Sequence, residues 1–91
     1  MNIGKAIKYI RKTKGITQTR LAELAGLSAN AMCSIENDKA FPNKDTINAI
    51  SKALNVSVPY LLFASITEED VPVEKQEIFK ALQKPILELF G

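Results

Sequence analysis

The sequence predicts an all-α protein, with a bundle of five short helices in residues 1–63 and a helical tail in residues 73–91. Three observations predict this fold class. Apolar residues recur at helical spacing along most of the chain, capping residues stand where helices would begin and end, and no segment alternates apolar and polar residues as a strand would. A short acidic linker, residues 64–72, joins the two parts.

The first expected helix covers residues 3–14, and Gly15 ends it. Its apolar residues follow the i, i+3, i+4, i+7 spacing of an amphipathic helix: Ile3, Ala6, Ile7 and Ile10. Basic residues occupy its other faces. Lys12 and Lys14, late in this helix, suit the negative end of the helix dipole.

Two shorter helices joined by a tight turn are expected in residues 17–36. Thr17 and Ser28 can cap them, because each hydroxyl can accept a backbone N–H bond from the first turn. Gly26 ends the first of the two, where a left-handed backbone costs a glycine little. Since the interval from Ala25 to Ser28 is too short for a loop, the helices must cross steeply, as in a helix-turn-helix motif. The residues expected to face inward are Leu21, Ala22, Leu24, Ala25, Ala31, Met32 and Ile35.

Two more helices complete the expected bundle. The preceding helix should end near Asn37 and Asp38, residue types that tolerate a left-handed backbone. After a loop that contains a Phe-Pro pair, the fourth helix is expected to begin at Asp45 or Thr46. Ser57 caps the fifth helix, which has a proline near its start, where a missing N–H does no harm. Together these two helices should close the core with Ile47, Ile50, Ala53, Leu54, Val56, Val58, Leu61, Leu62 and Phe63.

The last 19 residues carry much apolar surface. The linker before them is expected to form at most one helical turn, capped by Thr67. The tail places apolar residues three, four and three apart, the spacing of a helix-pairing seam, at Phe79, Leu82, Ile86 and Leu89, with Phe90 beside them. Pro85 predicts a kink or two short helices. Three roles stay open for this tail: it folds back on its own domain, it pairs with a second copy, or it binds another protein.

Composition and charge exclude several classes of protein. The chain has no histidine and one cysteine, so it can form neither an internal disulfide nor a cysteine-based zinc site, and we expect no metal and no cofactor. Residues 1–63 carry nine basic and four acidic residues, whereas residues 64–91 carry three and six, which favours a polyanion as the partner of the first part. No apolar run approaches the ~20 residues of a membrane span, and the N-terminus does not resemble a secretory signal, so we expect a cytoplasmic protein.

Several motifs stand in a fixed order between residues 17 and 62. They are a Gln just inside the second helix, Leu-Ala-x-x-Ala-Gly-Leu-Ser through the turn, Ile-Glu-Asn at the end of the third helix, a later Pro, and Ile-x-x-Ile-x-x-Ala-Leu-Asn-Val-Ser. This stretch resembles the phage repressor/Cro (XRE-type) helix-turn-helix family. The resemblance covers roughly residues 3–63 and implies a lambda-repressor-like bundle that binds double-stranded DNA, usually as a dimer. Asp38 departs from the family pattern, which often has a Gly there.

The resemblance also implies which residues meet DNA. Four residues of the third helix, residues 28–36, occupy base-reading positions: Ala29, Asn30, Cys33 and Ser34. Asn30 has the most informative chemistry, because its amide can bridge N6 and N7 of adenine, worth about 1–3 kcal/mol against a wrong base. Phosphate contacts are implied for Gln18, Ser28, Asn37, Lys39, Lys44 and Thr46, with Arg11 and Arg20 as further candidates. Glu36 is expected to be structural, with Arg20 or a backbone N–H as its partner.

Three functions are consistent with the sequence. The first is a sequence-specific transcriptional regulator, most simply a repressor that dimerises through Phe79, Leu82, Ile86, Leu89 and Phe90. The second is an antitoxin-like protein whose tail binds a protein partner while its head represses its own promoter. The third is an interaction domain that has lost DNA binding, although Gln18, Lys39 and Lys44 at phosphate positions argue against it. We expect no enzyme, because no catalytic cluster and no phosphate-binding loop is present.

Overall fold

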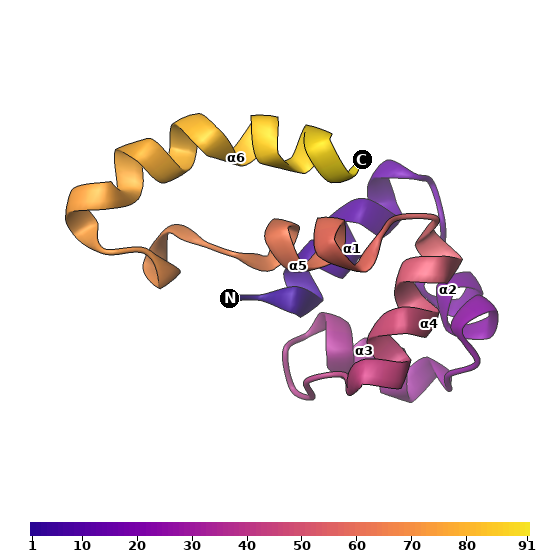
Figure 1. Cartoon of the computed structure of the whole chain (residues 1–91). Helices are drawn as coiled ribbons and strands as arrows, with labels where there is room; N and C mark the ends of the chain where they lie inside the picture. Colours follow the sequence, from indigo (N-terminus) through magenta and orange to yellow (C-terminus); the bar gives the residue numbers. More distant parts are fainter.

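The computed structural model describes all 91 residues, and every element in it is helical (Figure 1). Two short 3-10 turns, η1 and η2, separate the five-helix bundle from the tail helix. This arrangement confirms the all-α class and the five-helix bundle with its C-terminal helix. The elements are α1 (Ile3–Thr13), α2 (Gln18–Ala25), α3 (Ala29–Glu36), α4 (Lys44–Leu54), α5 (Val58–Ser65), η1 (Glu68–Asp70), η2 (Val73–Lys75) and α6 (Gln76–Phe90).

Side-chain caps begin most of these helices. The hydroxyls of Thr17, Ser28 and Ser57 each accept a backbone N–H from their helix, as the sequence predicts. The expected start of α4 at Asp45 or Thr46 is wrong by one or two residues. The side chain of Asn43 accepts the backbone N–H of Thr46, and this cap lets the helix begin at Lys44.

Left-handed residues follow four of the helices. Gly15, the predicted end of α1, has φ 70°. Gly26 has φ 71° and Asn55 has φ 58° at the C-terminal ends of α2 and α4. Asp38, which stands after α3, has φ 60°. The predicted turn at Asp38 is therefore confirmed, although a glycine would adopt this backbone at lower cost.

The core lies where α1, α2, α3, α4 and α5 meet. Its fully buried apolar residues are Ile3, Ala6, Ile7, Ile10, Leu21, Ala22, Met32, Ile35, Ile50, Leu54 and Leu61. Leu24 was expected to face inward but is 47% exposed. At 100° per residue it falls outside the narrow arc formed by Leu21, Ala22 and Ala25, which is the only part of α2 that the core covers. No single helix is long and apolar enough to cross a membrane; α4 and α5 pass that test only when they are joined across a bend of 102°.

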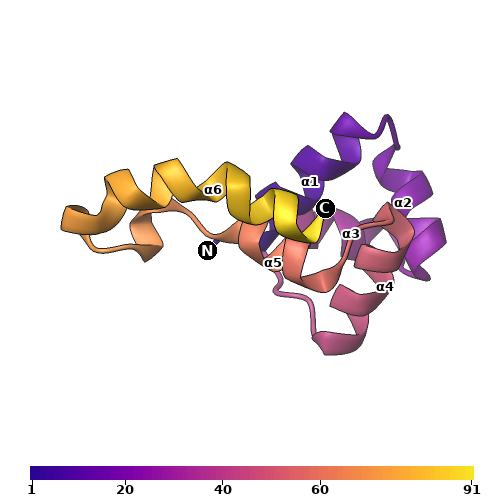
Figure 2. The same cartoon turned by 45° about the horizontal axis from the view of Figure 1, so that its top comes forward.

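The tail helix folds back over α5, which is the first of the three roles left open (Figure 2). At its C-terminal end the rings of Phe63 and Phe90 stack with centroids 5.4 Å apart, and Ser57 Oγ donates to the Phe90 carbonyl at 3.2 Å. At its N-terminal end the Gln76 amide donates to the carbonyls of Glu68 and Val71 at 3.0 and 3.3 Å. The tail is thus fastened at both ends.

Of the two alternatives expected at Pro85, a kink or two short helices, the second is wrong, because Pro85 lies inside the single helix α6. The ring removes the N–H that would bond the carbonyl of Ala81 and crowds that carbonyl. Because Ala81 is exposed, water can reach that carbonyl and limit the cost of the missing bond.

Candidate nucleic-acid interface

Helix α3 lies on the side of the bundle away from α6 (Figure 1). Met32 and Ile35 are buried in the core and fix the rotation of this helix. Ala29, Asn30 and Cys33 are consequently exposed. Ser34 is half-buried and is the least accessible of the four predicted base-reading residues.

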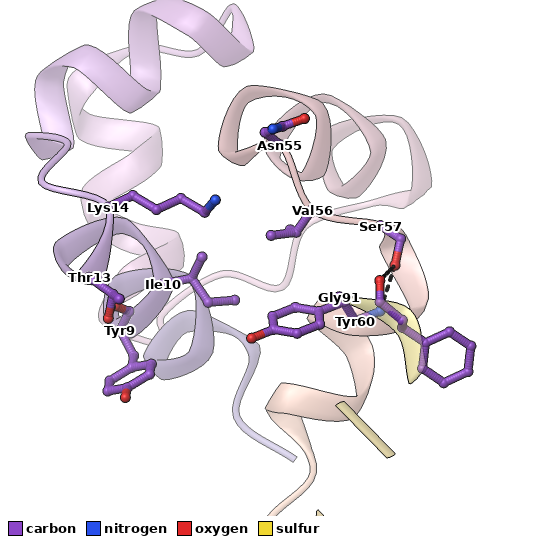
Figure 3. Close-up of a pocket in the computed structure, with 10 residues that line it drawn as sticks. Tyr9, Ile10, Thr13, Lys14, Asn55, Val56, Ser57, Tyr60 and Gly91 are labelled. Atoms are coloured by element: carbon purple, nitrogen blue, oxygen red, sulfur yellow. Dashed lines mark hydrogen bonds between the residues drawn. The ribbon is translucent and has the colours of Figure 1, made fainter. Parts of the chain in front are cut away.

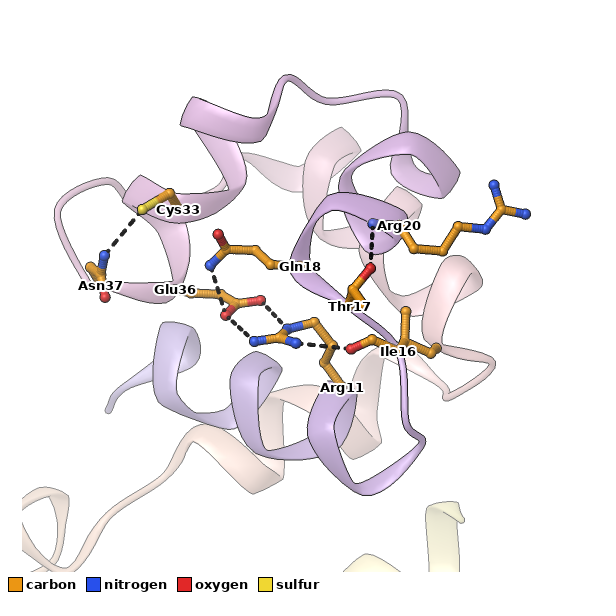
Figure 4. Close-up of polar contacts among 8 residues, drawn as sticks. All are labelled: Arg11, Ile16, Thr17, Gln18, Arg20, Cys33, Glu36 and Asn37. Atoms are coloured by element: carbon orange, nitrogen blue, oxygen red, sulfur yellow. Dashed lines mark hydrogen bonds and ion pairs between the residues drawn. The ribbon is translucent and has the colours of Figure 1, made fainter.

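A buried ion pair fastens α3 to the rest of the bundle (Figure 4). Arg11 Nε and Nη2 donate to the two carboxylate oxygens of Glu36 at 2.7 and 3.0 Å, which is a bidentate arrangement. Arg11 Nη1 also donates to the carbonyl of Ile16 at 2.8 Å, at the start of the connection into α2. Helix α3, helix α1 and the connection into α2 therefore share one polar network.

This network corrects two expectations. Glu36 pairs with Arg11 and not with Arg20, which forms an exposed ion pair with Glu23 at 3.1 Å and points away from the network in Figure 4. Arg11 was a candidate for a phosphate contact, but its side chain is buried and all three of its bonds stay within the protein. Arg11 therefore positions α3 and is not free to bind DNA.

Gln18 joins the same network from the first turn of α2. Its Nε2 donates to Glu36 Oε1 at 3.1 Å, which fixes the orientation of its amide. The amide nitrogen carries a second N–H, and the first-turn backbone N–H groups of α2 lie beside it, so this corner can hold an anion. The bond to Glu36 gives Gln18 the bracing role that the resemblance implies, and its phosphate contact stays a prediction.

The segment after α3 carries the other predicted phosphate residues. Asn37, Lys39 and Lys44 are exposed, and Thr46 is half-buried in the first turn of α4. The Asn37 amide is turned toward Cys33 Sγ at 3.3 Å, so it would have to rotate to reach a phosphate. Of this group, the two lysines are the side chains already free to meet a polyanion.

One cavity lies away from α3, between α1, the turn before α5 and the end of α6 (Figure 3). It holds about 330 Å³, and Tyr9, Ile10, Val56 and Tyr60 provide much of its wall. Lys14 is the one charged side chain in its lining. No group of three His, Cys, Asp or Glu side chains in the chain could hold a metal ion.

The comparisons with known proteins agree with this geometry. A family model described as helix-turn-helix matches residues 7–61, which spans α1 to α5. The chain belongs to the XRE-type helix-turn-helix family. It is accordingly a DNA-binding transcriptional regulator, and the family resemblance drawn from the sequence is confirmed.

Three relatives show how widely this XRE-type domain is used. The immunity repressor protein of Bacillus phage phi105 is 33% identical over 92% of this chain and 67% of its own length. The regulator DicA of Escherichia coli is 31% identical over the whole chain and 68% of its own length. The antitoxin PezA of Streptococcus pneumoniae is 35% identical over 84% of this chain.

The chain spans only part of many curated relatives. It covers 47% of PezA, 38% of the regulator PuuR of Escherichia coli and 49% of the regulator ImmR of Bacillus subtilis. No solved structure matches it significantly.

Sequence reasoning missed the role of Arg11, although a signal was present. Arg11 follows Ile7 by four residues, so it continues the inward stripe of α1 and had to find a partner inside the bundle. The cap at Asn43 was also missed. An Asn three residues before Thr46 is a standard helix-start signal that the acidic Asp45 obscured.

Proposed function

We propose that the chain is a dimeric repressor that inserts α3 into the major groove of DNA. The observation that carries the proposal is the exposed polar face of α3, held rigidly by the Arg11–Glu36 pair and capped by Ser28. A B-form major groove is about 12 Å wide and admits one α-helix. Asn30 reads adenine in each half-site, while Ala29, Cys33 and Ser34 contribute apolar or degenerate contacts. Gln18, Ser28, Asn37, Lys39, Lys44 and Thr46 hold the flanking phosphates.

The tail supplies the dimer interface in this proposal. The five residues expected at this interface lie in different environments. Phe79 and Ile86 line a cavity of about 430 Å³ together with Phe63. Leu82 and Leu89 are exposed. Phe90 is 40% exposed and stacks on Phe63. The face that remains for a second copy is a stripe of Ile78, Leu82 and Leu89 along α6.

The half-buried and the exposed residues of α6 therefore have separate roles. Phe79 and Ile86 hold the tail on its own head, and Leu82 and Leu89 pair with the same residues of a second chain. Two heads joined in this way can read two half-sites about 34–36 Å apart. The dimer carries out no chemical reaction and acts by occupying DNA, so its place of action is the cytoplasm, where bacterial DNA lies.

The second candidate is an antitoxin-like protein. The relative named antitoxin PezA and the exposed stripe favour it, because the same apolar residues could meet a different protein. In that case the isolated chain would stay monomeric, with the stripe open to solvent.

Sedimentation of the full chain from low micromolar concentration upward tests the proposal. We expect a dimer for the native chain and a monomer for Leu82→Glu. Leu24→Glu is the matched control, because Leu24 and Leu82 are both 47% exposed but lie on different faces, and it should remain dimeric. A native chain that is monomeric throughout this range would contradict the dimer and favour the antitoxin-like alternative.

A further inference from the structure

Phe41 is a large apolar side chain left in solvent beside the DNA-binding helix. It lies in the segment between α3 and α4 and is 65% exposed. The next residue, Pro42, is buried, so the chain turns inward immediately after the ring. An exposed phenylalanine in a soluble protein needs no explanation by itself, but this one borders a surface that binds DNA.

The backbone on both sides of Phe41 is fixed relative to α3. The N–H groups of Lys39 and Ala40 both donate to the carbonyl of Ser34, at 2.9 and 3.3 Å. Asp38 N–H donates to the carbonyl of Ile35 at 3.1 Å, and Asn43 caps α4 on the other side. The backbone that carries the ring is therefore held at a set position relative to α3.

Phe41 lies between two exposed lysines, and the exposed carboxylates of Asp38 and Asp45 stand next to them in the chain. Lys39 and Lys44 stand two residues before and three residues after it, and both are exposed. The segment is continuous with α3, whose eight residues extend about 12 Å, close to the width of the major groove. Chain that follows such a helix reaches the groove wall, where the sugar–phosphate strand separates the major from the minor groove.

We propose that Phe41 packs against the deoxyribose edge of the minor groove, between the phosphates that Lys39 and Lys44 hold. This inference rests on the proposed docking of α3. The sugars present carbon atoms that an aromatic ring can cover. Minor-groove proteins use apolar side chains such as Phe against the duplex, and the free energy needed to deform the groove depends on its sequence. Phe41 would then contribute specificity at base pairs that no side chain of α3 touches.

Salt dependence distinguishes this contact from a phosphate contact. Binding of the full chain is measured at several salt concentrations on a duplex that the native chain selects from a random pool. Phe41→Ala should weaken binding about tenfold at every concentration, because covering part of an aromatic ring releases no counterions. Lys39→Ala should instead lower the slope of log K against log salt by about 0.9. Phe41→Leu should fall between Phe41→Ala and the native chain.

Two control measurements accompany this test. Tyr9→Ala removes a comparably exposed ring, 72% exposed on α1, and should leave affinity unchanged. Thermal melting of Phe41→Ala should match that of the native chain, because the ring is mostly in solvent. An unchanged affinity for Phe41→Ala, or a reduced salt slope, would overturn the proposal.

Binding to a duplex with only one half-site shows whether Phe41 contacts DNA or a second copy of the chain. A loss of affinity that persists on one half-site supports the DNA contact. A loss seen only on a two-half-site duplex overturns it, because Phe41 would then contact the other copy. Failure of the native chain to select any duplex would instead count against the proposed function itself.

Discussion

Gly4 of α1 lies directly against the backbone of Ile35 at the end of α3. A methyl group at Gly4 would stand 2.1 Å from the Ile35 carbonyl oxygen and 3.0 Å from that of Glu36. Helix α1 can approach the recognition helix this closely only because residue 4 has no side chain.

Gly4→Ala should therefore destabilise the bundle, although the same change in an exposed helix stabilises by about 1 kcal/mol. The clash is with backbone, which cannot rotate away, so we expect a loss of at least about 2 kcal/mol in the free energy of unfolding. Urea denaturation measures it. Lys5→Ala, at the exposed neighbouring position, should stay within about 0.5 kcal/mol of the native chain, and an equally stable Gly4→Ala would contradict the close packing.

The buried pair of Arg11 and Glu36 predicts an asymmetric response to substitution. Glu36→Gln leaves the Arg11 charge buried without its partner and should cost about 3–5 kcal/mol. The double variant Arg11→Met, Glu36→Leu should recover much of that loss, since no isolated charge remains. The exposed pair provides the control: Arg20→Ala should cost about 0.5 kcal/mol or less. If Glu36→Gln and Arg20→Ala lowered the free energy of unfolding equally in the same denaturation series, the stabilising role of the Arg11–Glu36 pair would be refuted.

Ser51 carries a buried hydroxyl with no hydrogen-bond partner. Ser51→Ala removes this unsatisfied group and adds helix propensity, so the free energy of unfolding should rise by about 1 kcal/mol. Ser57→Ala, which removes the cap of α5, should lower it by a similar amount, about 1 kcal/mol. A destabilised Ser51→Ala in calorimetry would mean that the hydroxyl finds a partner in solution.

Asp70 links the linker to the chain start. A hydrogen bond from the Met1 amine and a second from the Thr67 backbone N–H lower the pKa of Asp70 below its ordinary value of 3.8. Because the pKa is depressed in the folded chain, its stabilising effect is present above pH 3.8 and is lost as the pH falls through the lower folded value. Carboxyl carbon shifts followed by NMR should show a midpoint below 3.8, and acetylation of the Met1 amine should move it upward. A titration midpoint that acetylation does not change would exclude the pairing of the Met1 amine with Asp70.

Local chemistry made most of the bundle predictable from sequence. Thr17, Ser28 and Gly26 act through their immediate neighbours, so the boundaries of α2 and α3 follow from residue type and spacing alone. The partner of Glu36 did not follow in this way. Arg11 lies 25 residues away, and only the packing of α1 against α3 brings the two side chains together.

The tail shows a second limit of sequence patterns. Apolar residues spaced three, four and three apart form one broad stripe along a helix. A single helix packed against that stripe can cover only part of it. At 100° per residue, Phe79 and Ile86 point almost the same way, and Leu82 and Leu89 lie about 60° around the helix. Because α5 covers the first pair, the stripe divides into an inner and an outer edge, a division that depends on where α5 lies.

Selection of random duplexes by the native chain and by Asn30→Ala tests most directly whether α3 reads DNA. We expect the native chain to select an inverted repeat with half-site centres about 34–36 Å apart and an adenine in each half-site. Asn30→Ala should lose the preference at that adenine, by about 1–3 kcal/mol, and keep the spacing. Enrichment of no shared sequence by the native chain, or an adenine preference untouched in Asn30→Ala, would contradict the placement of α3 in the major groove.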